Sequence, residues 1–168
     1  MQLTIRPLEQ TDIPEIAEAF QQLGWNKPAS KYERYLEEQT QGVRDALVAH
    51  VENRFAGYLT ICWASDYPPF REANIPEIVD LNVLPKFRRQ HIGSALMDRA
   101  ENVITKRSNF AGIGVGMDMD YGAAQRMYIL RGYIPDARGL YYKDHHLKYG
   151  EQVTVDIDLA LYFTKKLK

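Results

Sequence analysis

Cysteine, net charge and long apolar runs are all scarce in this sequence of 168 residues. The single cysteine, Cys62, excludes an internal disulfide and favours a reducing compartment. The net charge is −1, from 21 Lys and Arg against 22 Asp and Glu, so no general basic character points to nucleic acid or an anionic membrane. No apolar run approaches the ~20 residues of a membrane span, and residues 1–6 lack the pattern of a signal peptide. We therefore expect a cytoplasmic protein that binds neither nucleic acid nor a membrane.

What is present is the composition of a folded domain. Hydrophobic residues make up 45% of the chain and charged residues 26%, which are values typical of globular proteins. There are no internal repeats, no low-complexity segment and no break in composition. A chain of this length buries roughly two thirds of its unfolded surface as one core. We expect a single domain over residues 1–168.

Hydrophobic periodicity and turn residues predict alternating helices and strands. The expected strands cover residues 3–7, 46–51, 55–63, 78–83, 112–117, a segment from 133 onward, and 159–164. The expected helices cover residues 13–23, 30–42, 92–104 and 121–131. The order β-α-α-β-β-β-α-β-α-β-β, with a parallel crossover from 78–83 to 112–117 and hairpins on either side, indicates an α/β fold with a mixed sheet.

A short basic turn between the strand at 78–83 and the following helix is the most informative segment. Pro85 closes the strand, Arg88 and Arg89 supply positive charge, and the small residues 93–95 let a bulky anion approach the backbone. A helix N-terminus there offers free backbone N–H groups and the positive end of the helix dipole to phosphate. Neither G-x-G-x-x-G nor G-K-[ST] follows the strand, which argues against a dinucleotide fingerprint and a P-loop. The turn predicts a pyrophosphate site, and an ordinary loop with surface arginines is the alternative.

The run Arg88-Arg89-Gln90-His91-Ile92-Gly93, preceded by Leu81-Asn82-Val83-Leu84-Pro85, resembles the acetyl-CoA signature R/Q-x-x-G-x-G/A of the GNAT N-acetyltransferase superfamily. The order of elements also matches the GNAT fold, so the resemblance covers nearly the whole chain. It departs at His91, which stands where a first glycine is usual. If the backbone there has a positive φ, a residue other than glycine costs ~1 kcal/mol or more. A shifted register, from Gln90 through Gly93 to Ala95, also fits the signature but changes the spacing from Pro85.

The resemblance implies that acetyl-CoA is a co-substrate of this chain. The residues implied to bind it are Leu81, Asn82, Val83, Arg88, Arg89, Gln90, His91, Ile92, Gly93, Ser94, Ala95, Tyr121 and Ala124.

A second run, residues 121–133, is similar to the GNAT pattern N-x-x-A-x-x-L-Y-x-x-x-G-F. Ala124 and Tyr128 fall in register, whereas Tyr121 replaces the usual asparagine. In the family the matching tyrosine lies beside the thioester sulfur and protonates the leaving thiolate. The resemblance therefore implies that Tyr128 is the general acid.

Acetyl transfer also needs a polarised thioester carbonyl and a deprotonated amine. Backbone N–H groups of the strand at 78–83 can polarise the carbonyl, and the resemblance points to Val83. Glu77 and Asp80 are the candidate bases; by strand alternation they point to opposite faces, and Glu77 shares its face with Leu81 and Val83. We rank Glu77 first, while deprotonation through ordered water, which is common in the family, would leave no dedicated base.

The acceptor site is less clearly marked. In GNAT proteins the segment after the first helix, the loop before the phosphate strand and a late loop frame the acceptor pocket, which implies Trp25, Trp63 and Tyr67 here. Carboxylates and tyrosines crowd the C-terminal half and suit a cationic amine. They are Asp118, Asp120, Asp136, Asp144, Glu151, Asp156, Asp158, Tyr141, Tyr142 and Tyr149. His50, His145 and His146 have no further ligand at a suitable spacing, so no metal site is expected.

Together these features predict an N-acetyltransferase that moves the acetyl group of acetyl-CoA to a primary amine by direct attack in a ternary complex. The alternative is a non-catalytic acyl-CoA-binding or sensing module, which would have no need of an acid such as Tyr128. A nucleotide-binding regulatory domain is disfavoured because no adenine- or ribose-reading motif is present. Small amines and protein amino groups stay open as acceptors, and so do a monomer and a homodimer.

Overall fold

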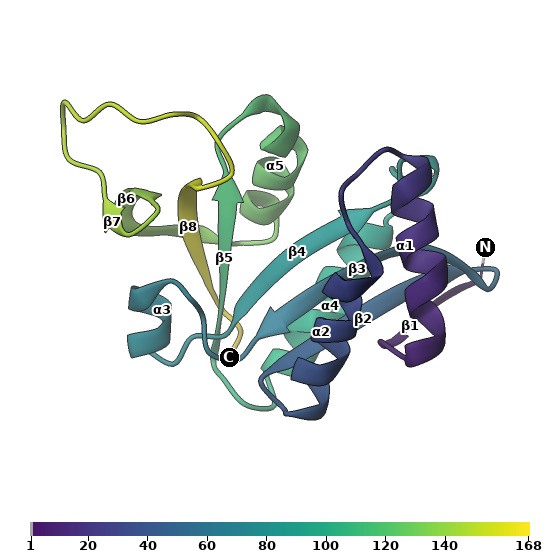
Figure 1. Ribbon diagram of the computed structural model, residues 1–168. Coiled ribbons are helices and arrows are strands. Elements are labelled where there is room, and N and C mark those ends of the chain that lie inside the picture. The colour runs from purple at the N-terminus through teal and green to yellow at the C-terminus, as the bar shows by residue number, and fades with distance from the viewer. Residues whose placement is uncertain (1) are drawn as a thin grey trace.

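Eight strands form one sheet in the order β1-β2-β3-β4-β5-β8-β6-β7 in the computed structural model, which describes residues 2–168 (Figure 1). The strands are β1 (Leu3–Pro7), β2 (Arg44–Val51), β3 (Arg54–Cys62), β4 (Glu77–Val83), β5 (Phe110–Gly116), β6 (Ile134–Tyr142), β7 (His145–His146) and β8 (Leu159–Lys166). The α-helices are α1 (Ile13–Gln22), α2 (Ala29–Thr40), α3 (Pro68–Glu72), α4 (Ile92–Ile104) and α5 (Gly122–Leu130). Short 3₁₀ helices are η1 (Gln10–Asp12), η2 (Pro85–Phe87) and η3 (Met119–Tyr121). Across residues 2–168, no helix combines the length and apolar character that a bilayer crossing requires.

Strands β2 and β3 run through the centre of the core. Residues 46–51 of β2 and 55–61 of β3 are all buried. Helices α1 and α2 cover one face of these strands, and α4 covers the other (Figure 1). Burial on both faces explains why the two strands read as continuous apolar runs rather than as an alternating pattern.

Helix α4 is held on the sheet by one apolar stripe. It buries Ile92, Leu96, Ala100 and Ile104, which recur at about one helical turn. The stripe fixes the direction of the helix, and its N-terminus follows directly on η2 and the end of β4. The basic turn therefore lies at the end of β4, as the sequence predicts.

The parallel strands β4 and β5 pair only at the first two residues of β4, Glu77 with Gly112 and Ile78 with Ile113. Beyond these pairs the two strands separate, as Figure 1 shows. On its other side β5 pairs with β8 along its whole length. The sheet is thus continuous on both sides of an opening between β4 and β5.

The predicted order of elements and the mixed sheet are confirmed, with two short additions. Helix α3 and strand β7 occupy segments in which the sequence predicts no element. Helix α3 begins with proline, which suits a first helical turn. Strand β7 has only two residues, so no alternation can be read from it. The insertion of β8 between β5 and β6 is a further feature that the order of elements does not specify.

Candidate active site

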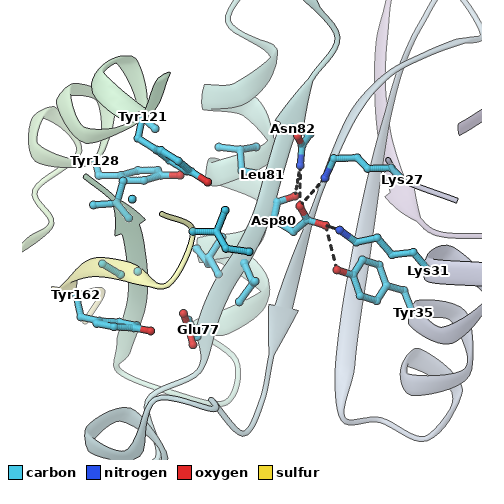
Figure 2. Close-up of a pocket in the computed structure, with 18 of the residues that line it drawn as sticks. Lys27, Lys31, Tyr35, Glu77, Asp80, Leu81, Asn82, Tyr121, Tyr128 and Tyr162 are labelled. Atoms are coloured by element: carbon cyan, nitrogen blue, oxygen red, sulfur yellow. Dashed lines mark hydrogen bonds and ion pairs between the residues drawn. The ribbon is translucent and has the colours of Figure 1, made fainter. Parts of the chain in front are cut away.

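The opening between β4 and β5 holds a cavity of about 770 Å³, here named the central cavity (Figure 2). Its walls come from both halves of the sheet and from the helices beside them. They comprise residues 77–82 of β4, residues 114–116 of β5, Tyr121 and Tyr128 beside β5, Tyr162 of β8, and Lys27, Lys31 and Tyr35 from the region of α2. The central cavity contains every candidate catalytic residue that the sequence predicts.

A bulge in β4 shapes the floor of this cavity. Pairing with β3 passes from Val79 opposite Thr60 to Asn82 opposite Tyr58, and Asp80 has φ +61°. The extra residue breaks the alternation of side chains. Val83, opposite Gly57, lies on the face of Ile78, which is opposite Ile61, and not on the face of Glu77. The prediction that Glu77 and Val83 share a face is therefore wrong, because strict alternation does not hold across a bulge.

Asp80 is bound by two lysines. Its carboxylate lies 2.7 Å from Lys31 Nζ and 3.1 Å from Lys27 Nζ. It also accepts hydrogen bonds from the hydroxyl groups of Tyr58 at 2.5 Å and Tyr35 at 3.0 Å. Burial by itself would raise the pKa of Asp80, but the two ammonium groups and the tyrosine hydroxyl outweigh it and hold that pKa well below its usual range. Asp80 is thus ionised and fully occupied, which makes it a weak proton acceptor.

Glu77 has the opposite electrostatic character. Its carboxylate accepts hydrogen bonds from Ser65 Oγ and from the backbone N–H of Gly114. Burial raises the pKa of Glu77 above its ordinary value, against the effect of these donors. Figure 2 shows the hydroxyl of Tyr162 directed toward the Glu77 side chain. A partly buried carboxylate with increased proton affinity, facing a cavity, has the properties of a general base.

Glu77 also lines a second space of about 250 Å³, here named the side cavity. The other walls of the side cavity include Asp66, Tyr67, Tyr141 and Lys143. Since Glu77 and Tyr162 belong to both cavities, the two spaces meet at these side chains.

Tyr128 projects from α5 into the central cavity. Its side chain is buried, and this burial raises the pKa of Tyr128 to about 12, so the hydroxyl keeps its proton at neutral pH. Figure 2 shows the hydroxyls of Tyr121 and Tyr128 directed from the β5 side toward β4. The ring of Tyr121 lies so close to Gly116 that a Cβ there would be 2.5 Å from it, which accounts for a glycine at that position. The arrangement can deliver a proton to a group held between β4 and α5.

The basic turn borders a third space of about 560 Å³, here named the turn cavity. Most of the predicted cofactor residues line it, namely Leu81, Asn82, Val83, Arg88, Arg89, His91, Ile92, Gly93, Ser94 and Ala124. Phe87 and Met127 also line it and were not predicted to bind the cofactor. Met127 stands at the leucine position of the second GNAT pattern, where an apolar residue is indistinguishable in sequence from a core residue. Gln90 and Ala95 do not line the turn cavity; Gln90 Nε2 donates to the Lys86 carbonyl at 3.2 Å, and the Ala95 N–H donates to the His91 carbonyl at 2.9 Å.

His91 has the backbone conformation expected of the missing glycine. It lies in the left-handed region, with φ +62° and ψ +12°, directly before α4. The chain therefore retains the glycine-type geometry of the turn with a residue for which that geometry is strained.

Of the three predicted acceptor-binding residues, only Tyr67 lines the central or the side cavity. Trp25 stacks on Phe20 with ring centroids 5.6 Å apart and lies 5.9 Å from the Arg88 guanidinium, beside the basic turn. The indole N–H of Trp63 donates to Asp45 at 3.1 Å, away from both cavities. The structure therefore does not bring the two tryptophans to the same cavity as Tyr67, because nearness of a segment to the site does not determine which way its side chain packs.

The acidic residues of the C-terminal half mostly bind their neighbours. Asp136 accepts from the Tyr67 hydroxyl at 2.6 Å, and Asp156 accepts from the Tyr142 hydroxyl at 3.0 Å. None of Asp118, Asp120, Asp136, Asp144, Glu151, Asp156 and Asp158 lines the central cavity. Among residues 2–168, no three His, Cys, Asp or Glu side chains are grouped as they would need to be to hold a metal ion.

The sheet is split between two parallel strands, with a basic turn after the end of β4 and Tyr128 of α5 facing the gap from the side of β5. Residues 11–133 match the acetyltransferase (GNAT) family, and the chain belongs to that family. No curated protein matches the chain.

Solved structures of the same fold cover nearly the whole chain. An N-acetyltransferase from Staphylococcus aureus Mu50 aligns with a TM-score of 0.72 at 16% identity, over 100% of both chains. The ribosomal-protein-S18-alanine N-acetyltransferase from Escherichia coli aligns with a TM-score of 0.70 at 16% identity, over 99% of this chain and 94% of that one. The Salmonella typhimurium protein yncA, solved with its cofactor acetyl-CoA, aligns with a TM-score of 0.70 at 17% identity, over 99% and 94%.

Proposed function

We propose that this protein is an N-acetyltransferase that moves the acetyl group of acetyl-CoA to a primary amine by direct attack in a ternary complex. One observation carries the proposal: a protonated tyrosine, Tyr128, and a carboxylate of raised pKa, Glu77, line a single cavity that adjoins the basic turn. A module that only binds acyl-CoA has no need of both groups.

Acetyl-CoA is the proposed acyl donor. Its pyrophosphate would bind over the turn cavity, where the N-terminus of α4 offers backbone N–H groups and Arg88 and Arg89 add positive charge. Its thioester arm would extend along β4 into the central cavity, with Tyr121 and Ala124 beside it. Leu81, Asn82 and Val83 line the space on the β4 side.

The acceptor starts as an ammonium group, so the reaction needs three proton transfers. Glu77 takes one proton from this group, and the neutral nitrogen then attacks the thioester carbonyl carbon while a backbone N–H of β4, at Val83 by the family resemblance, polarises the carbonyl. As the C–N bond forms, the C–S bond breaks and the leaving thiolate takes the hydroxyl proton of Tyr128. The nitrogen of the new amide loses its second proton to solvent, and exchange with solvent returns Tyr128 and Glu77 to their starting protonation states. Asp80, whose pKa is held low by its lysines, keeps the far wall of the cavity in place and is not assigned the role of base.

The test combines calorimetry with CoA and an assay of free thiol released from acetyl-CoA in the presence of a panel of amines. Gly93→Val should weaken CoA binding by at least about tenfold, because its side chain would project into the turn cavity. The fold should tolerate the change, since a Cβ at Gly93 meets Val83 Cγ2 at 3.7 Å and Met127 Sδ at 3.9 Å, which are ordinary contacts. Gly122→Val is the matched control, because a Cβ added at Gly122 would meet nothing within 4 Å. Binding of acetyl-CoA without thiol release for any amine would assign the protein to the non-catalytic alternative.

A further inference from the structure

Lys27 and Lys31 line the central cavity but have no part in the proposed acetyl transfer. Lys27 precedes α2, and Lys31 lies in its first turn. Their side chains are only 17% and 25% exposed, so both ammonium groups are partly buried against the cavity wall. Figure 2 shows them converging on Asp80 from the side of β4 opposite to Glu77.

The charges on this wall do not cancel. Within residues 2–168, Asp80 is the one carboxylate within 4.0 Å of either lysine. Two ammonium groups against one carboxylate leave one positive charge without a partner. Burial lowers the pKa of Lys27, and the neighbouring charge of Lys31 acts in the same direction against the attraction of Asp80. Keeping this unpaired positive charge partly buried therefore costs free energy, and a bound anion would offset that free-energy cost.

The hydrogen-bond donors on this wall are also in excess. An ammonium group has three N–H donors. Lys27 donates to Asp80 at 3.1 Å and to the Tyr58 hydroxyl at 3.3 Å, and Lys31 contacts Asp80 at 2.7 Å. The Asp80 oxygens already accept from Tyr58, Tyr35 and Asn82 as well. Donors on both lysines are thus left over, and the neighbouring carboxylate has no capacity to take them.

The opposite wall of the same cavity carries the other charge. Glu77 and Asp80 are the only carboxylates that line the central cavity within residues 2–168. Since Asp80 is occupied by the lysines, Glu77 is the carboxylate free to meet an incoming ammonium group. The cavity is therefore positive toward α2 and negative or proton-accepting toward β5.

We propose that the acceptor is a small zwitterion, in which a primary amine and an anionic group, a carboxylate or a phosphate, belong to one molecule. The anionic group binds Lys27 and Lys31, and the amine faces Glu77. This inference rests on the proposed acetyltransferase function and narrows its acceptor. It narrows the cationic amine expected from the acidic loops to one that also carries an anionic group, because a second cationic group would meet unpaired positive charge on the α2 wall.

Matched pairs of amines test the inference. The thiol-release assay compares β-alanine with β-alaninamide, and O-phosphoethanolamine with ethanolamine, with spermidine as a cationic amine. The rates are corrected for the fraction of neutral amine at the assay pH. We expect kcat/KM for the anion-bearing member of at least one pair to exceed that of its partner by at least about tenfold, which corresponds to ~1.4 kcal/mol. Preference for the carboxylate pair or for the phosphate pair identifies which anion the site takes.

Variants of Lys31 test whether the preference for anion-bearing amines depends on the lysines of the α2 wall. Lys31→Gln should reduce the preference at least about threefold while CoA affinity stays unchanged, and Lys31→Arg should retain it because the charge is kept. Lys106→Gln, at an exposed lysine of the loop after α4, is the matched control. Thermal unfolding of each variant checks that the protein is folded. If Lys31→Gln does not fold, the comparison of the amine pairs with the wild-type protein still tests the zwitterion.

The outcomes separate the two proposals. Acetylation of β-alaninamide and of ethanolamine that equals or exceeds that of their anion-bearing partners in both pairs, or fastest acetylation of spermidine, overturns the zwitterion while leaving the acetyltransferase function in place. A preference unchanged by Lys31→Gln in a folded protein overturns the role of the lysines. Absence of both acetyl-CoA binding and thiol release overturns the proposed function and the inference with it.

Discussion

The ring of Tyr67 lies flat against the ring of Tyr162, with centroids 3.6 Å apart and planes 2° apart. Tyr67 precedes α3, whereas Tyr162 lies in β8, so the stack joins the loop before β4 to the far half of the sheet. Both rings line the side cavity next to Glu77. The stack therefore holds together the segments that surround the proposed base.

Tyr67→Phe should destabilise the protein by ~1–3 kcal/mol. The hydroxyl donates to Asp136 at 2.6 Å and lies 2.7 Å from His146 Nε2, and its loss would leave the buried Asp136 carboxylate without that donor. Denaturant unfolding measures the change. Tyr149→Phe, at a fully exposed tyrosine, is the control. Equal free energies of unfolding for wild type and Tyr67→Phe would contradict the importance of these bonds.

Tyr128→Phe should lower kcat by ~10²-fold and leave the affinity for CoA unchanged, because the phenyl ring keeps the packing but cannot donate a proton. With the pKa of Tyr128 raised to about 12, the loss should be the same across the neutral pH range. Steady-state kinetics and calorimetry supply the two readouts. If turnover survives in the variant, the thiolate takes its proton from another group.

Glu77→Gln should remove the acidic limb of the pH profile. In the wild type, kcat/KM should rise with pH as Glu77 loses its proton, with a midpoint above the ordinary glutamate value of 4.5 because burial raises the pKa. The variant should show a lower rate without that limb, and Glu33→Gln, on the exposed side of α2, should behave like the wild type. A limb that persists in Glu77→Gln would show that another group is the base.

The same substitution should change stability with a defined sign. Because folding raises the pKa of Glu77, the folded protein holds this proton more tightly than the unfolded chain, and unfolding releases it. The contribution of Glu77 to stability is therefore greatest below the unfolded pKa and is lost as pH rises through the folded pKa. Glu77→Gln should gain stability relative to wild type over that interval. Melting temperatures measured from acid to neutral pH test this, and a constant difference would argue against a raised pKa.

His91→Gly should stabilise the protein by about 0.5–1 kcal/mol, because glycine adopts φ +62° without strain, although it also adds entropy to the unfolded chain. Thermal unfolding gives the result. Ser94→Gly, at a helical position of α4, is the contrasting control and should destabilise. Destabilisation by His91→Gly would mean that contacts of the imidazole stabilise the protein by more than the backbone strain destabilises it.

The sequence predicted those parts of the fold and site that depend on local chemistry. Each of these patterns lies within a single helix, strand or turn and follows from its geometry. They are the buried stripe of α4, the apolar runs of β2 and β3, and the turn with Arg88 and Arg89. For the same reason, the left-handed conformation at His91 could be anticipated from the glycine it replaces.

What could not be predicted depends on contacts between distant segments. The bulge at Asp80 exchanges the faces of β4 and is not marked by glycine or proline. Lys27 and Lys31 resemble ordinary solvated lysines in sequence, since their partner Asp80 lies in a different element. Trp63 was expected in the site, yet its orientation is determined by Asp45 and by the Arg107 guanidinium 3.8 Å from its ring.

The position of β8 between β5 and β6 imposes an order on folding during synthesis. Strands β1 to β5 can pair with one another as soon as they leave the ribosome, but β6 pairs only with β7 and β8. A nascent chain can therefore pair β6 only with the two residues of β7 until residues 159–166 have emerged. The half of the protein that carries the basic turn can assemble first, and the wall containing Tyr162 is added last. An interrupted chain would thus hold the basic turn without the wall that completes the central cavity.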